Sequence, residues 1–207
     1  QLSAVQQTSA IATGTIEVMS TTGLLDVLSG GAGIGTFGSG SISLHADGAA
    51  AGNLSVNALV QTISGAITLR ADNNVTFTAN GDVASGSGNV VVNADDDNSG
   101  AAGGLLTMAD GALINAGSGT ITLTSDGDVT LGGLQTTNAT ATAVQVTSRE
   151  GGIIDGGDSD IDIIANAAGS LVTLNAAGGI GHGNALETTA ARLAATNSGS
   201  GNIQIIE

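Results

Sequence analysis

The chain lacks cysteine, proline, tryptophan, tyrosine and lysine, and it has only two phenylalanines in 207 residues. Without cysteine it can form neither a disulfide framework nor a thiolate metal site. Because aromatic rings normally supply much of the buried area of a core, Ile, Val, Leu and Ala must fill this interior. The absence of proline and of a three-residue glycine period excludes collagen. Small, uniform side chains suit thin layers that repeat.

Positive charge is also scarce. Eighteen acidic residues face three arginines, and the net charge is −15. Nucleic acids and anionic membrane surfaces bind clustered basic residues, whereas Arg70, Arg149 and Arg192 are far apart in the sequence. No run approaches the roughly 20 apolar residues of a transmembrane helix, and residues 1–5 do not resemble a signal peptide. We expect no nucleic-acid partner, no membrane insertion, and a mature protein or an excised piece.

One five-residue phrase recurs along the chain. It consists of Gly, a small or polar residue, Ile or Val, any residue, and then Leu, Val or Ile. Apolar and polar residues alternate with period two, which is typical of a half-buried strand. Copies with the glycine begin at Gly14, Gly40, Gly65, Gly88, Gly119 and Gly201, and weaker copies without it occupy residues 142–146 and 159–163.

A small residue followed by Asp or Asn comes after many of these strands. Such residues bond to nearby backbone and tolerate left-handed dihedral angles, so we expect corners there. Residues 95–100 look like an insertion that projects from one corner, and short second strands are expected at residues 75–78 and 129–131. The expected corners are residues 46–48, 71–73, 94–96, 125–127 and 165–167.

The spacing of the phrases decides the fold class. Between Gly14 and Thr142, successive copies recur at intervals of roughly 20–30 residues, as is typical of a β-solenoid. A hairpin meander would show tight two-residue turns, and a βαβ fold would show helical patterns between the strands. Neither pattern is present. We predict an all-β, parallel β-helix of roughly nine irregular turns, forming one continuous domain over residues 1–207.

The repeats resemble those of filamentous-haemagglutinin-type proteins. The resemblance rests on GTITLTSDGDV (residues 119–129), GGIG (178–181) and the segment 186–205. These are large bacterial surface proteins exported by two-partner secretion or autotransport. The resemblance covers nearly the whole chain and implies a right-handed β-helix in a secreted or surface-attached fibre, often with adhesive roles. The Asn-Pro-Asn motif of the amino-terminal secretion domain is missing, so the chain would match the repetitive shaft.

The densest acidic run is Asp-Gly-Gly-Asp-Ser-Asp-Ile-Asp, residues 155–162. Calcium prefers several oxygen ligands from such loops, but the spacing fits neither the EF-hand nor the calcium-binding nonapeptide repeat. Asp160 and Asp162 are expected to share the solvent face of a strand. Solvated carboxylates are therefore the favoured interpretation, with a structural calcium site as the alternative. Asp95, Asp96 and Asp97 are explained by a corner loop.

No catalytic, cofactor-binding or metal-binding residues are assigned from the sequence, and no cofactor is expected. His45 is placed at an outward strand position and His182 in a turn, and no constellation can be assembled around either. A polysaccharide-active enzyme is a remote alternative, since parallel β-helices host such enzymes. It would require Arg70, Arg149 or Arg192 beside two carboxylates on one face.

The two ends of the chain direct the functional hypothesis. Residues 2–5 and 202–207 look like strands, and no capping helix is indicated at either end. Free strand edges template further pairing, so we expect the solenoid to continue in a longer chain or to stack end to end with other copies. The expected function is a non-catalytic structural component of an extracellular or cell-surface bacterial fibre. The alternative is an adhesive module that contacts a surface or glycan ligand through corner loops, of which Arg149-Glu150 is the main charged one.

Overall fold

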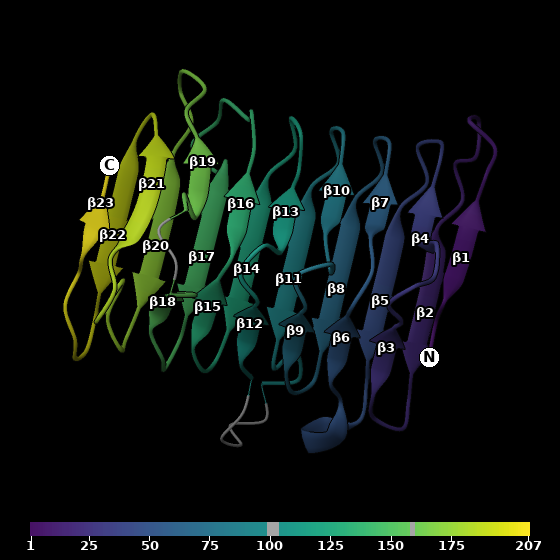
Figure 1. Ribbon diagram of the computed structural model, residues 1–207, viewed down its shortest axis with the longest axis horizontal. Helices are drawn as coiled ribbons and strands as arrows, with labels where there is room; N and C mark the ends of the chain where they lie inside the picture. Colours follow the sequence, from purple (N-terminus) through teal and green to yellow (C-terminus); the bar gives the residue numbers. More distant parts are fainter. Residues whose placement is uncertain (99–103, 158–159) are drawn as a thin grey trace.

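The protein is a rod of short strands stacked side by side, as seen in a computed structural model that describes residues 1–98, 104–157 and 160–207 (Figure 1). Every strand pair in these ranges is parallel, and the strands form three sheets stacked along the rod. One 3-10 helix, η1 (Ala49–Ala51), interrupts the strands of these ranges. No helix in the described residues is long and apolar enough to cross a membrane.

From the first strand to the twentieth, successive strands belong to sheets 3, 1 and 2 in a fixed order. Sheet 1 contains β2 (Ile16–Ser20), β5 (Ile42–Ala46), β8 (Ile67–Ala71), β11 (Val90–Ala94), β14 (Ile121–Ser125), β17 (Val144–Ser148), β20 (Val172–Ala176) and β22 (Leu193–Asn197). Sheet 2 contains β3 (Leu25–Val27), β6 (Leu54–Val56), β9 (Val75–Phe77), β12 (Leu106–Met108), β15 (Val129–Leu131) and β18 (Ile153–Asp155). Sheet 3 contains β1 (Ala4–Gln7), β4 (Gly33–Thr36), β7 (Val60–Thr62), β10 (Val83–Ser85), β13 (Leu113–Asn115), β16 (Gly133–Gln135), β19 (Ile163–Ala165), β21 (Leu186–Ala190) and β23 (Ile205–Ile206). Beyond β18, isolated bridges of Ile180 and Ile203 take the place of sheet 2 strands.

The predicted parallel β-solenoid is confirmed, but the expected nine turns are wrong. The eight strands of sheet 1 make about seven turns. The expected number assumed that every turn contains as few residues as the interval from Gly65 to Gly88. Corner insertions make most turns longer than this, and the longest insertion follows β11, before the chain returns to sheet 1 at β14.

Two copies of the phrase do not form strands of sheet 1. In residues 159–163, Ile161 is 48% exposed, and the strand β19 starts at Ile163 in sheet 3. In residues 201–205, Ile203 forms an isolated bridge with Ile180, and β23 belongs to sheet 3. The sheet 1 strands of this part of the rod are β20 and β22, which do not begin with the glycine phrase. The copy at residues 142–146 does form a sheet 1 strand, β17.

The core consists of ladders in which equivalent residues lie directly above one another. Parallel pairing places every residue beside its counterpart one turn away, so the phrase's apolar residues stack. All of them except those in the two end strands, β2 and β22, are fully buried. The first inward position of sheet 1 is held by Ile16, Ile42, Ile67, Val90, Ile121, Val144, Val172 and Leu193, and the second by Val18, Leu44, Leu69, Val92, Leu123, Val146, Leu174 and Ala195.

The glycine of the phrase has a steric role at the corner before sheet 1. A Cβ on Gly65 would lie 1.9 Å from Gly40 O, and a Cβ on Gly88 would lie 1.8 Å from Gly65 O. The backbones of successive turns therefore touch here, and only glycine fits. Buried hydroxyls hold the same corner, since Thr62 Oγ1 donates to Gly65 O at 2.7 Å and Ser85 Oγ accepts from Gly88 N at 2.7 Å.

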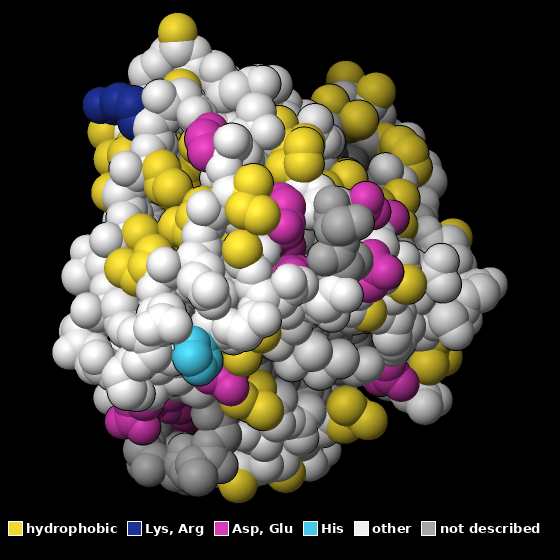
Figure 2. Space-filling view, turned by 60° about the vertical axis from the view of Figure 1, so that its left-hand side comes forward, with side chains coloured by type: hydrophobic (Ala, Val, Ile, Leu, Met, Phe, Trp, Pro, Cys, Tyr) yellow, Lys and Arg dark blue, Asp and Glu magenta, His cyan; other side chains and the backbone are white. Residues whose placement is uncertain are grey.

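At each end of the rod the sheets finish with strands that pair on one side only within the described residues. These strands are β1 and β2 at the N-terminal end, and β22 and β23 at the C-terminal end. Sheet 2 is extended at the two ends by isolated bridges of Leu2 and Ile203. Figure 2, in which the C-terminal end comes forward, shows hydrophobic side chains spread over that end. Half-buried residues finish the ladders, and we call them the N-terminal end plate (Leu2, Val5 and Val18) and the C-terminal end plate (Leu193, Ala195 and Ile205).

The glycine ladder gives a test of the fold. We expect Gly88→Ala to lower the free energy of unfolding by about 3 kcal/mol or more, because the new methyl group overlaps a backbone oxygen that cannot move aside. Gly14→Ala is the matched control, since its Cβ would meet only the end of the Gln7 side chain at 3.4 Å. Urea unfolding followed by circular dichroism measures both. Equal stability of the two variants would contradict the contact between turns.

Candidate functional site

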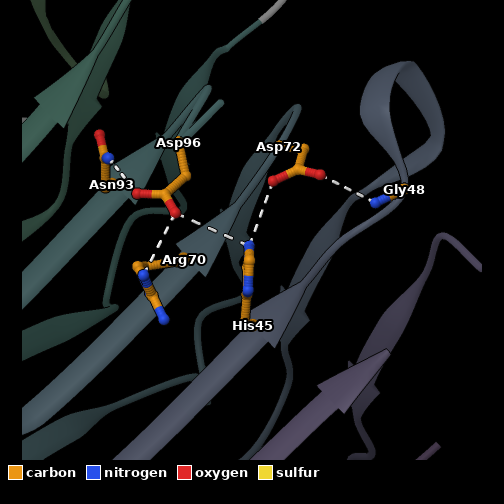
Figure 3. Close-up of polar contacts among 6 residues, drawn as sticks. All are labelled: His45, Gly48, Arg70, Asp72, Asn93 and Asp96. Atoms are coloured by element: carbon orange, nitrogen blue, oxygen red, sulfur yellow. Dashed lines mark hydrogen bonds and ion pairs between the residues drawn. The ribbon is translucent and has the colours of Figure 1, made fainter. Parts of the chain in front are cut away.

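A group of polar side chains lies on the outer face of sheet 1 at its exit corner (Figure 3). His45 on β5, Arg70 on β8 and Asn93 on β11 occupy the same outward position in three successive turns. Asp72 and Asp96 follow β8 and β11 at the corner, where their carboxylates reach back over these side chains. We call these five residues the His45 cluster.

Both carboxylates of the His45 cluster converge on the imidazole. His45 Nε2 lies 3.1 Å from Asp72 Oδ1 and 3.7 Å from Asp96 Oδ2. Arg70 Nη1 lies 3.4 Å from the same oxygen of Asp96. The remaining oxygens are also held, because Gly48 N donates to Asp72 Oδ2 at 2.9 Å and Asn93 Nδ2 donates to Asp96 Oδ1 at 2.6 Å.

The cluster is partly shielded from solvent. The side chains of Asp72, His45 and Asp96 are 8%, 18% and 20% exposed, whereas that of Arg70 is 39% exposed. This environment strengthens the attraction between the groups relative to water but leaves one side open to solution. Chemically, the arrangement offers an imidazole nitrogen and two fixed carboxylate oxygens, which can accept a proton or bind a cation.

The sequence placed His45 correctly on the outer face but missed its surroundings. Its neighbours Asp72 and Asp96 come one and two turns later along the chain. Aligning the repeats on the first inward residue of each strand is the signal that could have found them. His45, Arg70 and Asn93 then fall on one position, three residues after Ile42, Ile67 and Val90, respectively.

The corner aspartates are buried, although they were expected to be ordinary turn residues. Asp72, Asp95 and Asp126 are 7%, 3% and 7% exposed. Asp95 adopts a left-handed backbone conformation with φ of 61°, which Asp tolerates better than most residues. The expected insertion after β11 begins here, and its residues 99 and 100 lie outside the described residues. The expected corner at residues 165–167 follows a strand of sheet 3, not of sheet 1.

Arg149 is the partner of Asp126 at this corner. Its Nη1 donates to Asp126 Oδ1 at 2.6 Å. Burial alone would raise the pKa of Asp126, but hydrogen bonds from Arg149 and Asp95 and the charge of Arg149 outweigh burial and hold the pKa below its ordinary value. Arg149, proposed from the sequence as a binding anchor, is thus engaged within the chain.

The acidic run at residues 155–162 is not the row of solvated carboxylates that the sequence suggested. Asp155 and Asp162 are 4% and 3% exposed, and Asp162 precedes β19 instead of facing solvent from a strand. Glu187 of β21 joins them, and one oxygen of each carboxylate lies within 4.8 Å of the others. Glu187 N donates to Asp162 Oδ2 at 2.9 Å, and Asn184 Nδ2 donates to Asp155 Oδ2. Residues 158 and 159 lie outside the described residues.

Two sequence candidates, His182 and Arg192, and one pocket remain. His182 is exposed in a loop before β21. Arg192 donates to the carbonyl oxygens of Gly169 and Ser170, and so ties two turns together. A pocket of about 180 Å³ lies beside sheet 3, away from the His45 cluster, and is lined by Asp110, Gly111, Ala112, Leu113, Gly132, Gly133, Asp160, Ile161 and Asp162.

Comparison of the chain with protein-family models, curated proteins and solved structures found no match.

The Asp126–Arg149 pair predicts a pH-dependent stability. Because the pKa of Asp126 is lower in the folded than in the unfolded chain, its contribution is complete above the unfolded value, near 4, and is lost as the pH falls through the folded value. We expect Asp126→Asn to lower the free energy of unfolding by about 1–3 kcal/mol at pH 7 and the deficit to shrink below about pH 4.

Urea unfolding at pH 7, 5 and 3 measures this difference. Asp47→Asn is the control, since Asp47 occupies the same corner position two turns before Asp95 and is half-buried. It should change stability less at pH 7. A deficit of Asp126→Asn that stays constant over the whole pH range would show that the effect does not come from its charge.

Proposed function

We propose that the chain is a non-catalytic structural component of an extracellular bacterial fibre, in which the solenoid forms part of a shaft. The observation that carries this proposal is the match between the two ends of the rod. The N-terminal turn presents β1, β2 and the Leu2 bridge, and the C-terminal turn presents β22, β23 and the Ile203 bridge. Each end therefore offers one strand position from each of the same three sheets.

This match favours continuation of the stack. An unpaired strand edge offers a row of backbone donors and acceptors to another strand. A further solenoid turn, from the same polypeptide or from another copy stacked head to tail, would continue all three sheets in register. It would also cover the half-buried residues Val18 and Leu193, which finish the ladders at opposite ends. Head-to-tail contacts of this kind are heterologous and generate open fibres.

The charge and the repeats agree with an extracellular shaft. A net charge of −15 keeps rods of this kind soluble and disfavours lateral association between them. The resemblance of residues 119–129 to filamentous-haemagglutinin-type repeats supports a location in the secreted or surface-attached part of a bacterial fibre. An adhesive role for the corner loops would add to the shaft function and not replace it.

One observation favours a second candidate, a polysaccharide-active enzyme. The His45 cluster brings Arg70, His45 and two carboxylates to one face, which is close to the arrangement that this hypothesis requires. However, Arg70 is paired with Asp96, and the chain has no Trp or Tyr to stack on sugar rings. Incubation with neutral and acidic polysaccharides, followed by a reducing-end assay, tests it. We expect no fragments, and release that is lost in His45→Gln would support the enzyme instead.

Electron microscopy of the purified protein tests the shaft. We expect rods of uniform width that join end to end as the concentration rises. Ala195→Lys should reduce the joining, because it places a charge among the apolar residues of the C-terminal end plate, where the open end allows the ammonium group to reach water. Ala194→Lys is the matched control. It lies on the outward face of the same strand and should leave the joining unchanged.

Single rods at every concentration would contradict end-to-end continuation. Equal joining by the two lysine variants would show that the contacts seen in the images do not involve the C-terminal end plate. Circular dichroism spectra of both variants establish that the solenoid itself is intact.

A further inference from the structure

Three potential metal ligands come from successive turns, His45 from β5 and Asp72 and Asp96 from the corners after β8 and β11. His45 Nε2, Asp72 Oδ1 and Asp96 Oδ2 all lie within 4.8 Å of one another. An imidazole nitrogen and two carboxylate oxygens are ligands that Zn²⁺ accepts, and three protein ligands with a water in the fourth position form a common zinc site. We propose that His45, Asp72 and Asp96 bind one Zn²⁺ ion. This inference does not depend on the proposed function.

The spacing of the three atoms suits a tetrahedral ion. With ligand bonds of about 2.0–2.1 Å, two ligands of a tetrahedral Zn²⁺ lie about 3.3–3.4 Å apart. The distances from His45 Nε2 to Asp72 Oδ1 and Asp96 Oδ2, 3.1 and 3.7 Å, fall on either side of this value. Asp72 Oδ1 and Asp96 Oδ2 lie within 4.8 Å of each other, so small side-chain rotations would bring all three atoms to the tetrahedral spacing.

The outer oxygens of both carboxylates are already fixed. Gly48 N holds Asp72 Oδ2, and Asn93 Nδ2 holds Asp96 Oδ1. Each carboxylate therefore presents its other oxygen to the imidazole in a set direction. Hydrogen bonds of this kind orient metal ligands in zinc sites, and their loss typically lowers metal affinity about 10- to 100-fold.

Charge balance requires Arg70 to leave its contact with Asp96 when Zn²⁺ binds. The two carboxylates neutralise Zn²⁺, so the guanidinium beside Asp96 becomes surplus positive charge. Arg70 is held weakly at this position, because its contact with Asp96 is 3.4 Å long and its Nε atom has no hydrogen-bond partner in the described part of the chain. With 39% of its side chain exposed, it can turn into solvent. Removal of Arg70 should therefore favour the metal.

Isothermal titration calorimetry of tag-free protein with ZnCl2 tests the proposal. We expect one Zn²⁺ per chain, bound with micromolar affinity or better, and a rise in Tm that EDTA reverses. CaCl2 and MgCl2 should not produce the same rise, because the imidazole ligand suits neither ion. X-ray absorption at the zinc edge should show one imidazole among nitrogen and oxygen ligands.

Variants distinguish this site from metal bound elsewhere on the chain. His45→Gln should lower the affinity by more than the roughly 100-fold upper value for an outer hydrogen bond, and Asn93→Ala should lower it about 10-fold. Arg70→Gln should bind more tightly than the unchanged chain, whereas metal at a different place would not respond to this change. His182→Gln is the matched control, since it removes the exposed imidazole from a loop and should leave binding unchanged.

Three outcomes would overturn the proposal. They are the absence of saturable zinc binding up to millimolar concentration, binding by His45→Gln as tight as that of the unchanged chain, and a spectrum without imidazole. Far-ultraviolet circular dichroism shows whether His45→Gln still folds. If it does not, the Arg70→Gln titration and the zinc-edge spectrum of the unchanged chain decide the question.

Discussion

Parallel hydrogen bonding between successive turns fixes where every side chain of this rod lies. It places each residue about 4.8 Å from its counterpart in the next turn, although a whole turn of chain separates the two. The residue type at each position is therefore either repeated in the next turn or complemented there by a residue that fits beside it. Leu44, Leu69 and Val92 stack because each completes the burial of its neighbours. The glycines that begin the phrase stack because their backbones touch.

This constraint explains why the fold could be predicted from the sequence. Because the same positions point inward in successive turns, apolar residues alternate with period two in the sequence. Because the corner before each strand has no room for a Cβ, a glycine precedes this alternation. The prediction failed where these conditions lapse. Both failures, β20 and β22, lie near the C-terminal end. Before β20, the glycine with positive φ (Gly169, 100°) comes one residue earlier than the phrase requires. β22 follows β21 after only two residues. The isoleucines of residues 159–163 and 201–205 match the phrase, but the lengths of the turns place them outside the strands of sheet 1.

The polar groups were less predictable, because their proximity depends on the register between turns. His45, Asp72 and Asp96 carry no local motif, and the length of each corner decides which outward residues meet. Asp162 illustrates the same limit. The alternation of residues 159–163 suggested a solvent-facing carboxylate, but the side chain is buried beside Asp155 and Glu187. Only Asp155 and Asp162 of this group are near in sequence, so local spacing could not reveal the third carboxylate.

Stacking like residues creates an electrostatic problem for a chain with 18 acidic residues. Where Asp recurs at one corner in successive turns, the stacked carboxylates repel one another unless opposite charges or protons lie among them. The exit corner of sheet 1 meets this requirement. Of the five Arg and His residues in the chain, three lie at this corner and contact its aspartates, namely His45, Arg70 and Arg149. The scarce basic residues are thus concentrated at the corner where Asp72, Asp95 and Asp126 stack as buried carboxylates. The buried carboxylates of Asp155 and Asp162 instead accept hydrogen bonds from Asn184 Nδ2 and Glu187 N.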